Sequence, residues 1–286
     1  MFVTFVIPVF GTEAFLPRCL DAFSRQTDAD FEVVVVDDCS PGGNGREEST
    51  EEIVARYDAR FRQVRQPRNL SAYQARNRGI REAAGEYVAF CDPDDYVLPD
   101  LVSRLKALVR AELPDMIAYN CERDRGGVIS AHWCNCADGL ICPKTALELM
   151  VSKRLQWNVW TKAIRRDCCL KALDLQPYAA NAYINSSDDF CLLIPALLQC
   201  QNVRTAAFAG YRYCENGNSV TVSQTSLKGL LRALVQTLRA RGIVRRYVRE
   251  QGCPPEVVRS VDRIARMIVR WFLVEMKAAF RKRIRR

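Results

Sequence analysis

The chain has 286 residues, of which 49% are hydrophobic and 26% are charged. This balance is typical of a globular protein, and no low-complexity tract interrupts it, so a disordered or fibrous protein is excluded. The net charge of +9 favours acidic partners, such as phosphorylated substrates, anionic lipid or nucleic acid, without choosing among them.

Membrane-crossing and secreted classes are not indicated. No apolar run approaches the roughly 18 residues that a spanning helix needs. The opening residues, MFVTFVIPVF, lack the basic segment and small-residue cleavage site of a signal peptide. Thirteen cysteines in a chain of this length without an export signal are expected to be reduced and mostly buried. We predict a cytoplasmic protein, either free or peripheral at the inner face of the cytoplasmic membrane.

Strand and helix patterns alternate through the first third of the chain. The run TFVIPVF is continuously apolar, as in a strand covered on both faces, and an amphipathic helix follows it. The run FEVVVVDDCS predicts the next strand. The segment STEEIVARYDARF predicts a helix that begins with a capping box between Ser49 and Glu52.

A further helix is predicted over AYQARNRGIREAA. Ser71 is expected to cap its beginning, and Gly85 is expected as its left-handed stop. The run EYVAF then supplies another strand. This alternation predicts an α/β fold, with a mainly parallel, right-handed mixed sheet flanked by helices.

Acidic side chains stand where two of these strands end. Sheets of this kind bind ligands beyond the carboxyl ends of their strands. Asp37–Asp38 and Asp92–Asp95 both fall at such ends. The sequence Asp-Pro-Asp-Asp offers carboxylate oxygens to Mg²⁺ or Mn²⁺ and leaves coordination positions for a diphosphate. A solvated acidic turn is the alternative, because Asp and Pro are good turn residues.

The pattern loosens from residue 116 onward. The run DMIAYNCE predicts a strand, RDRGGVISAHWCNCADGLICP a hairpin-like excursion, and PKTALELMVSKRLQW a helix. A loop entering a helix follows at NAYINSSDDFCLLIPALLQC, and then a strand at VRTAAFAGYRYC. His132 with Cys134, Cys136 and Cys142 departs from the familiar zinc spacings, so an ordinary loop with partly buried thiols is predicted there.

Three ordered motifs resemble the family 2 glycosyltransferases, which have a GT-A fold and use nucleotide-sugar donors. They are VTFVIPVFGTEAFLPRCLDAFSRQT, FEVVVVDDCS and QPRNLSAYQARNRGIREAAGEYVAFCDPDDYVLPD. The resemblance is specific over residues 1–105 and looser to residue 222. It implies a nucleotide-sugar-binding half at 1–115 and an acceptor-binding half of the same domain at 116–222. Residues 223–286 form a basic helical extension.

The resemblance implies a donor site. Pro8 and Phe10 match positions that line the nucleotide pocket. Asp38 matches the acid that accepts a hydrogen bond from the base, and a carboxylate suits the imide N–H of uracil. Arg76 matches a donor-pocket residue whose guanidinium can grip phosphate in a fork. A solvent-facing helix arginine is the alternative.

Metal binding also follows from the resemblance. Asp92 and Asp94 match its DxD acids, and Asp94 or the adjacent Asp95 is expected nearest to Mn²⁺ or Mg²⁺.

The resemblance also implies a general base, which is needed because a protonated hydroxyl attacks poorly. The stretch SSDDFCLL matches an acid pair that opens a helix, with Asp188 at the usual glutamate position and Asp189 as the base. Helix N-terminal acids that serve only the dipole are the alternative. The stretch WNVWTKAIRRDCC matches a region near the acceptor, so Trp157, Asn158 and Lys162 are expected to line that site. Core packing is the alternative for both tryptophans.

The C-terminal segment has a basic amphipathic pattern. On a helical wheel one face carries Ile264, Met267, Ile268, Trp271, Phe272 and Ala279, and the other carries Arg263, Arg266, Arg270, Lys277 and Arg281. An interfacial helix on anionic lipid has this pattern. So does a helix that packs on the catalytic domain and leaves its basic face in solvent. No nucleic-acid recognition motif accompanies the charges, so nucleic acid is not predicted as a partner.

The resemblance implies an inverting, metal-dependent glycosyltransferase of the hexosyltransferase class. It would move one sugar from a UDP-linked donor to a hydroxyl on a glycan or lipid-linked acceptor, in the assembly of capsule, lipopolysaccharide or exopolysaccharide. One alternative is a haloacid-dehalogenase-like phosphatase, although Tyr96 stands where that class carries Thr or Val. The other, motivated by the altered SSDDF, is a nucleotide-sugar-binding protein without catalysis.

Overall fold

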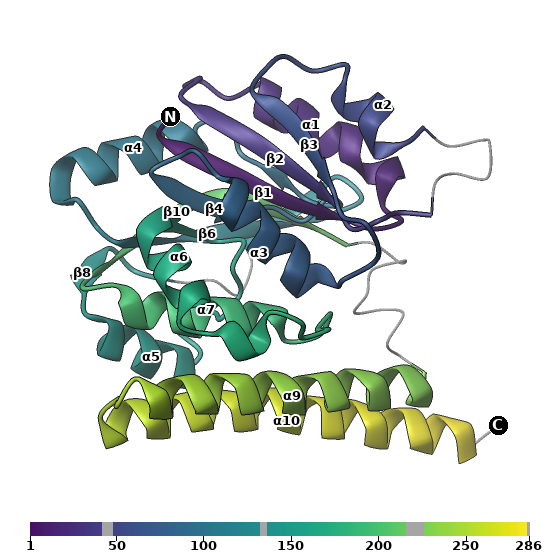
Figure 1. Ribbon diagram of the computed structural model, residues 1–286, viewed down its shortest axis with the longest axis vertical. Helices are drawn as coiled ribbons and strands as arrows, with labels where there is room; N and C mark the ends of the chain where they lie inside the picture. The colour runs from purple at the N-terminus through teal and green to yellow at the C-terminus, as the bar shows by residue number, and fades with distance from the viewer. Residues whose placement is uncertain (42–47, 132–135, 216–225, 285–286) are drawn as a thin grey trace.

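The computed structural model describes residues 1–41, 48–131, 136–215 and 226–284 (Figure 1). The strands are β1 (Val3–Val9), β2 (Phe31–Asp37), β3 (Phe61–Arg65), β4 (Tyr87–Phe90), β5 (Tyr96–Val97), β6 (Met116–Arg125), β7 (Val128–Ala131), β8 (Gly139–Ile141), β9 (Lys162–Arg165) and β10 (Val203–Cys214). The helices are α1 (Leu16–Ser24), α2 (Thr50–Val54), α3 (Ala72–Glu82), α4 (Leu101–Glu112), α5 (Pro143–Val151), α6 (Arg166–Asp174), α7 (Asp188–Gln199), α9 (Leu227–Glu250) and α10 (Pro255–Ile284), with 3₁₀ turns η1 (Glu13–Phe15) and η2 (Pro177–Ala179).

A ten-stranded mixed sheet organises the molecule. Its order is β3-β2-β1-β4-β9-β6-β10-β5, with β7 paired to β6 and β8 paired to β10. Strands β3, β2, β1 and β4 run parallel, and β10 runs parallel to β6. Strand β9 enters antiparallel between β4 and β6 and joins the two parallel groups into one sheet. The predicted mainly parallel α/β sheet is confirmed.

The central strands are covered on both faces, which explains their continuous apolar runs. Phe5 and Ile7 of β1 belong to the core that includes α1 and α4. The intervening Val6 belongs to the other core, under α3, α6 and α7. Alternate side chains of one strand therefore fill two separate cores. Figure 1 shows the helices on the two sides of the sheet.

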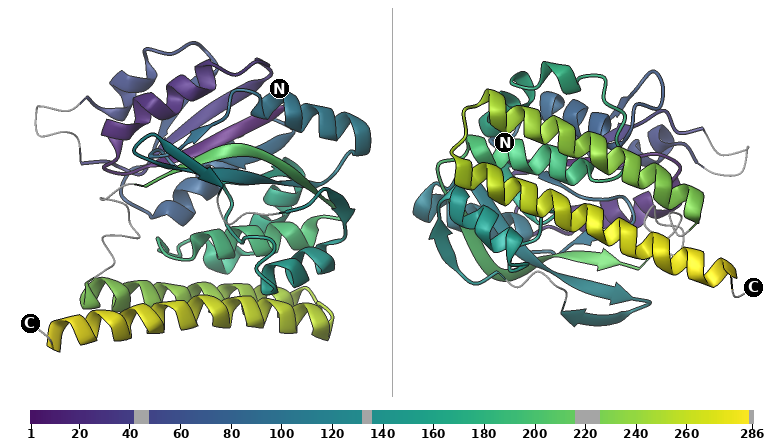
Figure 2. Two further views of the ribbon diagram at one scale, coloured as in Figure 1. Left: turned by 180° about the vertical axis from the view of Figure 1, so that it is seen from behind. Right: turned by 90° about the horizontal axis from the view of Figure 1, so that it is seen from below.

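Helices α9 and α10 form an antiparallel hairpin that lies along one side of the molecule (Figures 1 and 2). Helix α9 packs on α7, and α10 packs on α5 and α9. Ile264, Ile268 and Phe272 are buried in the core on the α7 side of the sheet. Of the two interpretations left open, the packed helix is correct for these three residues, which do not face lipid. Among the described residues, no helix is both long and apolar enough to cross a membrane.

Some local predictions fail for identifiable reasons. The capping box of Ser49 and Glu52 is confirmed, but α2 ends at Val54 and the rest of the predicted helix forms the turn before β3. There the Asp58 carboxylate accepts hydrogen bonds from the backbone and side chain of Arg60, which competes with helix continuation. The helix predicted over PKTALELMVSKRLQW likewise ends early, at Val151.

Ser71 and Gly85 do not have the predicted capping roles. Ser71 precedes α3 but makes no side-chain capping hydrogen bond, and its φ is +94°. Gly85 lies beyond the end of α3 and is not left-handed. A glycine is needed there because the backbone lies too close to β1 for a side chain. A Cβ would lie 2.6 Å from the Thr4 amide nitrogen and 2.7 Å from the Val3 carbonyl carbon.

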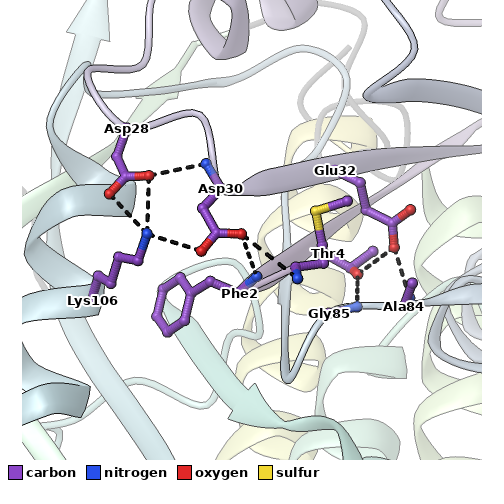
Figure 3. A network of polar contacts seen from close by, with 9 residues as sticks. Phe2, Thr4, Asp28, Asp30, Glu32, Ala84, Gly85 and Lys106 are labelled. Carbon is purple, nitrogen blue, oxygen red and sulfur yellow. Dashed lines mark hydrogen bonds and ion pairs between the residues drawn. The ribbon is translucent and has the colours of Figure 1, made fainter.

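The amino ends of the parallel strands are tied by a polar network (Figure 3). Glu32 accepts hydrogen bonds from the Thr4 hydroxyl at 2.6 Å and from the Ala84 amide at 2.7 Å. Lys106 of α4 forms ion pairs with Asp30 at 2.9 Å and with Asp28 at 3.2 Å. Each acid at this end therefore has partners from within the fold.

The described cysteines are free thiols, most of them buried, as predicted. Cys136 is buried and its thiol donates a hydrogen bond to Asn120 Oδ1, whereas Cys142 is exposed. His132 and Cys134 lie outside the described residues.

Candidate functional site

The loop Cys91–Asp95 follows the fully buried strand β4 at the carboxyl end of the sheet. The backbone amide of Asp92 donates to the Tyr211 hydroxyl at 3.1 Å, which fixes the start of the loop. The side chain of Asp92 is 30% exposed. Asp94 is also partly exposed, and its carbonyl oxygen accepts a hydrogen bond from Arg18 of α1. Two carboxylates thus reach the surface at the end of an apolar strand.

Arg76 joins this loop to the beginning of α7. One guanidinium nitrogen lies 2.6 Å from Asp92 Oδ1, and another pairs with Asp188. The arginine is only 6% exposed, so the solvent-facing alternative is wrong. Three of the predicted site residues, from α3, the loop after β4 and the first turn of α7, therefore meet in one place.

Both acids that open α7 have pKa values raised above the usual range. Burial raises the pKa of Asp188, although Arg76 opposes this. Burial, followed by the charge of Asp188, raises the pKa of Asp189 to about 8. Burial lowers the pKa of Arg76, but Asp188 and Asp92 outweigh it and raise that pKa overall. One guanidinium thus faces more carboxylates than it can neutralise, and Asp189 can hold or release a proton near neutral pH.

Asp95 is bound within the protein. Its side chain is 1% exposed, with one oxygen accepting from the Tyr211 hydroxyl and the other from the Cys214 amide, each at 2.7 Å. Burial raises its pKa, and Asp92 and Asp94 add to the effect. These contacts favour an anchoring role for Asp95, in place of the metal contact expected from the sequence. Tyr211 was missed by sequence reasoning, since a tyrosine in an apolar strand carries no signal of this role.

The acids after β2 also hold the chain in place. Asp37 is fully buried, accepts from the Ser40 amide at 2.7 Å and pairs with Arg65. Asp38 is 2% exposed and accepts three hydrogen bonds, from the Gln66 side chain and the amides of Leu70 and Ser71. A carboxylate has about four acceptor positions, so one remains for a ligand.

Two predicted pocket residues lie at the end of β1. Pro8 is partly buried, and Phe10 directly after the strand is 50% exposed. An exposed aromatic ring at a strand end can stack on a flat base.

A divalent cation fits part of this acid set. Within the described residues, no three His, Cys, Asp or Glu side chains are grouped closely enough to cage a metal ion. The fit is therefore to an ion such as Mg²⁺ or Mn²⁺, which binds through one or two carboxylates and takes its other ligands from water and phosphate. Asp92 and Asp94 are the partly exposed carboxylates of this loop that could hold such an ion.

The residues expected near the acceptor form a buried polar cluster. Lys162 is fully buried, and its ammonium donates to Asn158 Oδ1 at 2.9 Å and to Thr161 Oγ1 at 2.7 Å. Asn158 is 7% exposed, and Trp157 packs partly buried against the core. The positive charge of Lys162 lowers the pKa of Asp189, which is otherwise raised by burial. This arrangement favours an electrostatic role for Lys162 over direct contact with an acceptor. Trp160 is core, as the alternative predicted, and stacks on Tyr211 at 4.7 Å.

The loop before α7 is held by α9. The Asn185 amide donates to Gln236 Oε1 at 2.7 Å, and the hydroxyls of Ser187 and Thr237 lie 2.9 Å apart. Ser187 has a φ of +65°, a strained conformation for a residue with a side chain, directly before Asp188. The C-terminal hairpin therefore positions the acid pair. Sequence reasoning missed Gln236 and Thr237, because nothing in the pattern of α9 marks them.

The chain is similar to known glycosyltransferases. The family model described as Glycosyl transferase family 2 matches residues 4–173, more than half of the chain. The uncharacterized glycosyltransferase EpsJ of Bacillus subtilis is 29% identical over 224 residues, covering 77% of this chain and 62% of that protein. The succinoglycan biosynthesis protein ExoO of Rhizobium meliloti is 36% identical over 104 residues, covering 36% of this chain and 28% of that protein. The chain thus spans less than two thirds of these relatives.

Solved structures share the fold. TarS 1-349 of S. aureus in complex with UDP-GlcNAc superposes with a TM-score of 0.62 at 18% identity, covering 87% of this chain and 72% of that chain. GalNAc-T7 with UDP, GalNAc and Mn²⁺ gives a TM-score of 0.57 at 15% identity, covering 75% of this chain and 43% of that chain. The predicted GT-A fold is confirmed.

Proposed function

Because the chain belongs to glycosyl transferase family 2 and is therefore a glycosyltransferase, we propose that it transfers one sugar from a UDP-linked donor to a hydroxyl acceptor with inversion at the anomeric carbon. Membership of this family removes the phosphatase alternative. The names of the relatives and the basic charge of the chain support a glycan or lipid-linked acceptor in bacterial surface polysaccharide synthesis. We place the reaction in the cytoplasm, at the inner face of the membrane.

The observation that carries the proposal is the junction at Arg76. The Arg76 guanidinium contacts the DxD loop at Asp92 and the acid pair of α7 at Asp188. These two acids are 96 residues apart in the sequence. A glycosyl transfer needs these two groups on either side of one anomeric carbon. Here a single buried side chain fixes their separation.

The donor end is assigned from the strand ends. Phe10 would stack on the base, Pro8 would line the same pocket, and the remaining acceptor position of Asp38 would take the imide N–H. Arg76 would contact the diphosphate. A divalent cation held by Asp94 and Asp92 would supply positive charge to the diphosphate as it leaves. Binding of positive charge there also relieves the repulsion among the neighbouring carboxylates.

The chemical step is assigned to Asp189. Its carboxylate takes the proton of the acceptor hydroxyl while the acceptor oxygen forms a bond to the anomeric carbon. The bond between that carbon and the diphosphate oxygen breaks, and UDP leaves with the electron pair. Asp188 stays paired with Arg76 and orients the first turn of α7. Lys162, behind them, adjusts the pKa of Asp189, and Trp157 and Asn158 support the acceptor side.

A panel of nucleotide sugars tests the proposal directly. Each donor is incubated with the full chain and Mn²⁺, and released nucleotide diphosphate is measured. Hydrolysis of a UDP-sugar that exceeds that of GDP- and CMP-sugars is expected, because transferases slowly pass the sugar to water. Donor binding without turnover of any donor, unchanged in Asp189→Asn, would favour the non-catalytic binding protein instead.

A further inference from the structure

The outward surface of the C-terminal hairpin carries apolar side chains that the core does not use. On α9, Leu231, Val235 and Leu238 follow each other at helical spacing and are 43–52% exposed. On α10, Trp271 and Val274 are 45% and 55% exposed. Leu273 is exposed as well. These six residues are called the hairpin patch below.

The patch residues of α9 and those of α10 lie at similar distances along the hairpin from its connecting turn. The helices are antiparallel and side by side, joined by the turn at 251–254. At a rise of about 1.5 Å per residue, the patch residues of both helices lie about 18–29 Å from that turn. The view from below in Figure 2 shows both helices in front of the rest of the molecule. The exposed apolar residues of both helices therefore lie in the same stretch of the hairpin, away from the connecting turn.

Basic side chains surround this surface. Residues 227–278 contain twelve lysines and arginines and four acids. Arg263, Arg266 and Arg270 are exposed, and no ion pair among the described residues involves them. With Arg241 they line a groove of about 620 Å³ whose other walls include Met267 and Leu273. Positive and apolar groups thus alternate over the same surface.

We propose that the hairpin patch docks on a bilayer that contains anionic phospholipid. Apolar side chains enter the headgroup boundary while arginines bind lipid phosphates, which is how amphipathic surface helices bind membranes. A second copy of the chain would bring like-charged arginines together. Nucleic acid would use the charges but leave the apolar groups exposed to water.

The docking surface lies next to the residues that hold the acid pair. Gln236 and Thr237, which hydrogen-bond the loop before α7, lie on the inward side of the turn of α9 whose outward side carries Val235 and Leu238. Docking would therefore leave the thickness of one helix, about 10 Å, between the bilayer and the loop that carries the acid pair. Any link between docking and a lipid-linked acceptor rests on the proposed function, whereas the docking itself does not.

Co-sedimentation of the full chain with vesicles tests the docking. Vesicles of phosphatidylcholine alone are compared with an equimolar mixture of phosphatidylcholine and phosphatidylglycerol. We expect at least about tenfold tighter binding to the anionic vesicles. The double substitution Arg263→Glu/Arg270→Glu should weaken that binding by at least about tenfold. The matched control Arg25→Glu/Arg110→Glu makes the same charge change at exposed arginines of the catalytic domain and should leave binding nearly unchanged.

The apolar contribution is tested separately. Leu231→Ser/Val274→Ser should weaken vesicle binding, and the control Val128→Ser/Leu140→Ser, at exposed apolar residues outside the hairpin, should not. Tryptophan fluorescence should shift to shorter wavelength on the anionic vesicles, and Trp271→Phe should remove most of the shift. Circular dichroism checks that each variant is folded.

Several results would overturn the docking proposal. The first is an equal loss of vesicle binding in the hairpin and control variants. The second is a fluorescence shift on anionic vesicles that persists in Trp271→Phe. The third is dimerisation through the patch without vesicle binding. UDP-sugar hydrolysis without vesicles is measured on the same variants. It should be unaffected, so loss of docking and loss of transferase activity are separate outcomes.

Discussion

At the amino ends of the parallel strands, Glu32 and Asp30 have donors from the fold within 3 Å. At the carboxyl ends of the same sheet, Asp92 and Asp188 share one guanidinium, and Asp189 lies beside them. Each end holds at least one buried carboxylate, Glu32 at the first and Asp188 at the second. Only the first end supplies enough hydrogen bonds and positive charge to neutralise them.

The pKa values express this difference. Burial raises the pKa of Glu32, but hydrogen bonds from Thr4, Ala84 and Arg62 outweigh it and leave the pKa below its usual value. Burial also raises the pKa of Asp189, and there the neighbouring Asp188 adds to the rise. An acid whose charge the fold stabilises serves structure. At Asp189 the fold opposes the charge, and the carboxyl group is suited to proton transfer, whereas Asp95, whose pKa burial also raises, is held by Tyr211 and Cys214.

The largest expected effect is on catalysis at the carboxyl end. Asp189→Asn keeps the shape of the side chain but removes the base, so kcat should fall by roughly 10²–10⁴-fold. UDP affinity should stay within about twofold, because the proposed mechanism places Asp189 at the acceptor and away from the nucleotide. Steady-state kinetics and calorimetry on the same preparation measure both. A variant with wild-type kcat would remove Asp189 from the reaction.

At the amino end the expected effect is on stability alone. Glu32→Ala leaves the buried Thr4 hydroxyl and Ala84 amide without their acceptor, which should lower the free energy of unfolding by about 1–3 kcal/mol. Glu82→Ala, which removes only partly exposed pairs with Arg62 and Arg78, should cost under about 1 kcal/mol. Urea unfolding gives both values, and kcat at low temperature should match wild type. A loss of kcat in folded Glu32→Ala would contradict the division between the two ends.

The pH dependence of stability should show that the fold disfavours the ionised form of Asp189. Its pKa is about 8 in the folded chain and near 3.9 when unfolded, so the folded state binds more protons between these values. Stability therefore falls as pH rises from about 4 to 8. In Asp189→Asn the free energy of unfolding should decrease less over this pH range. At pH 8 the variant should be more stable than wild type by at least about 1 kcal/mol. Equal slopes of the unfolding free energy against pH would show that the pKa is not raised.

A smaller effect is expected from the contact between α9 and the base-bearing loop. Thr237→Val removes the hydroxyl that meets Ser187 and should lower kcat by about tenfold, with a stability loss of about 1 kcal/mol. Thr205→Val removes a buried hydroxyl that donates to the Ala137 carbonyl, far from the acid pair. It should cost similar stability and leave kcat unchanged. Equal kcat in the two variants would mean that Thr237 only stabilises the fold.

Much of this architecture was accessible from the sequence. Continuous apolar runs identified β1, β2 and β4 as buried strands, with acids directly after β2 and β4, and family motifs pointed to Arg76, Asp92 and Asp188 as site residues. Phe61–Arg65 was missed as a strand because its apolar content is low and it lies at the sheet edge. The partners of Asp95 and Ser187 were inaccessible, because Tyr211 and Thr237 reach them only through tertiary packing.

The central claim is that the carboxyl-end acids bind a metal and a nucleotide diphosphate. Calorimetric titration of UDP, with and without Mn²⁺, into wild type and Asp94→Ala tests it most directly. Mn²⁺ should tighten UDP binding by at least about tenfold in wild type and by much less in Asp94→Ala. UDP affinity that is the same in both proteins, or indifferent to Mn²⁺ in wild type, would contradict the account.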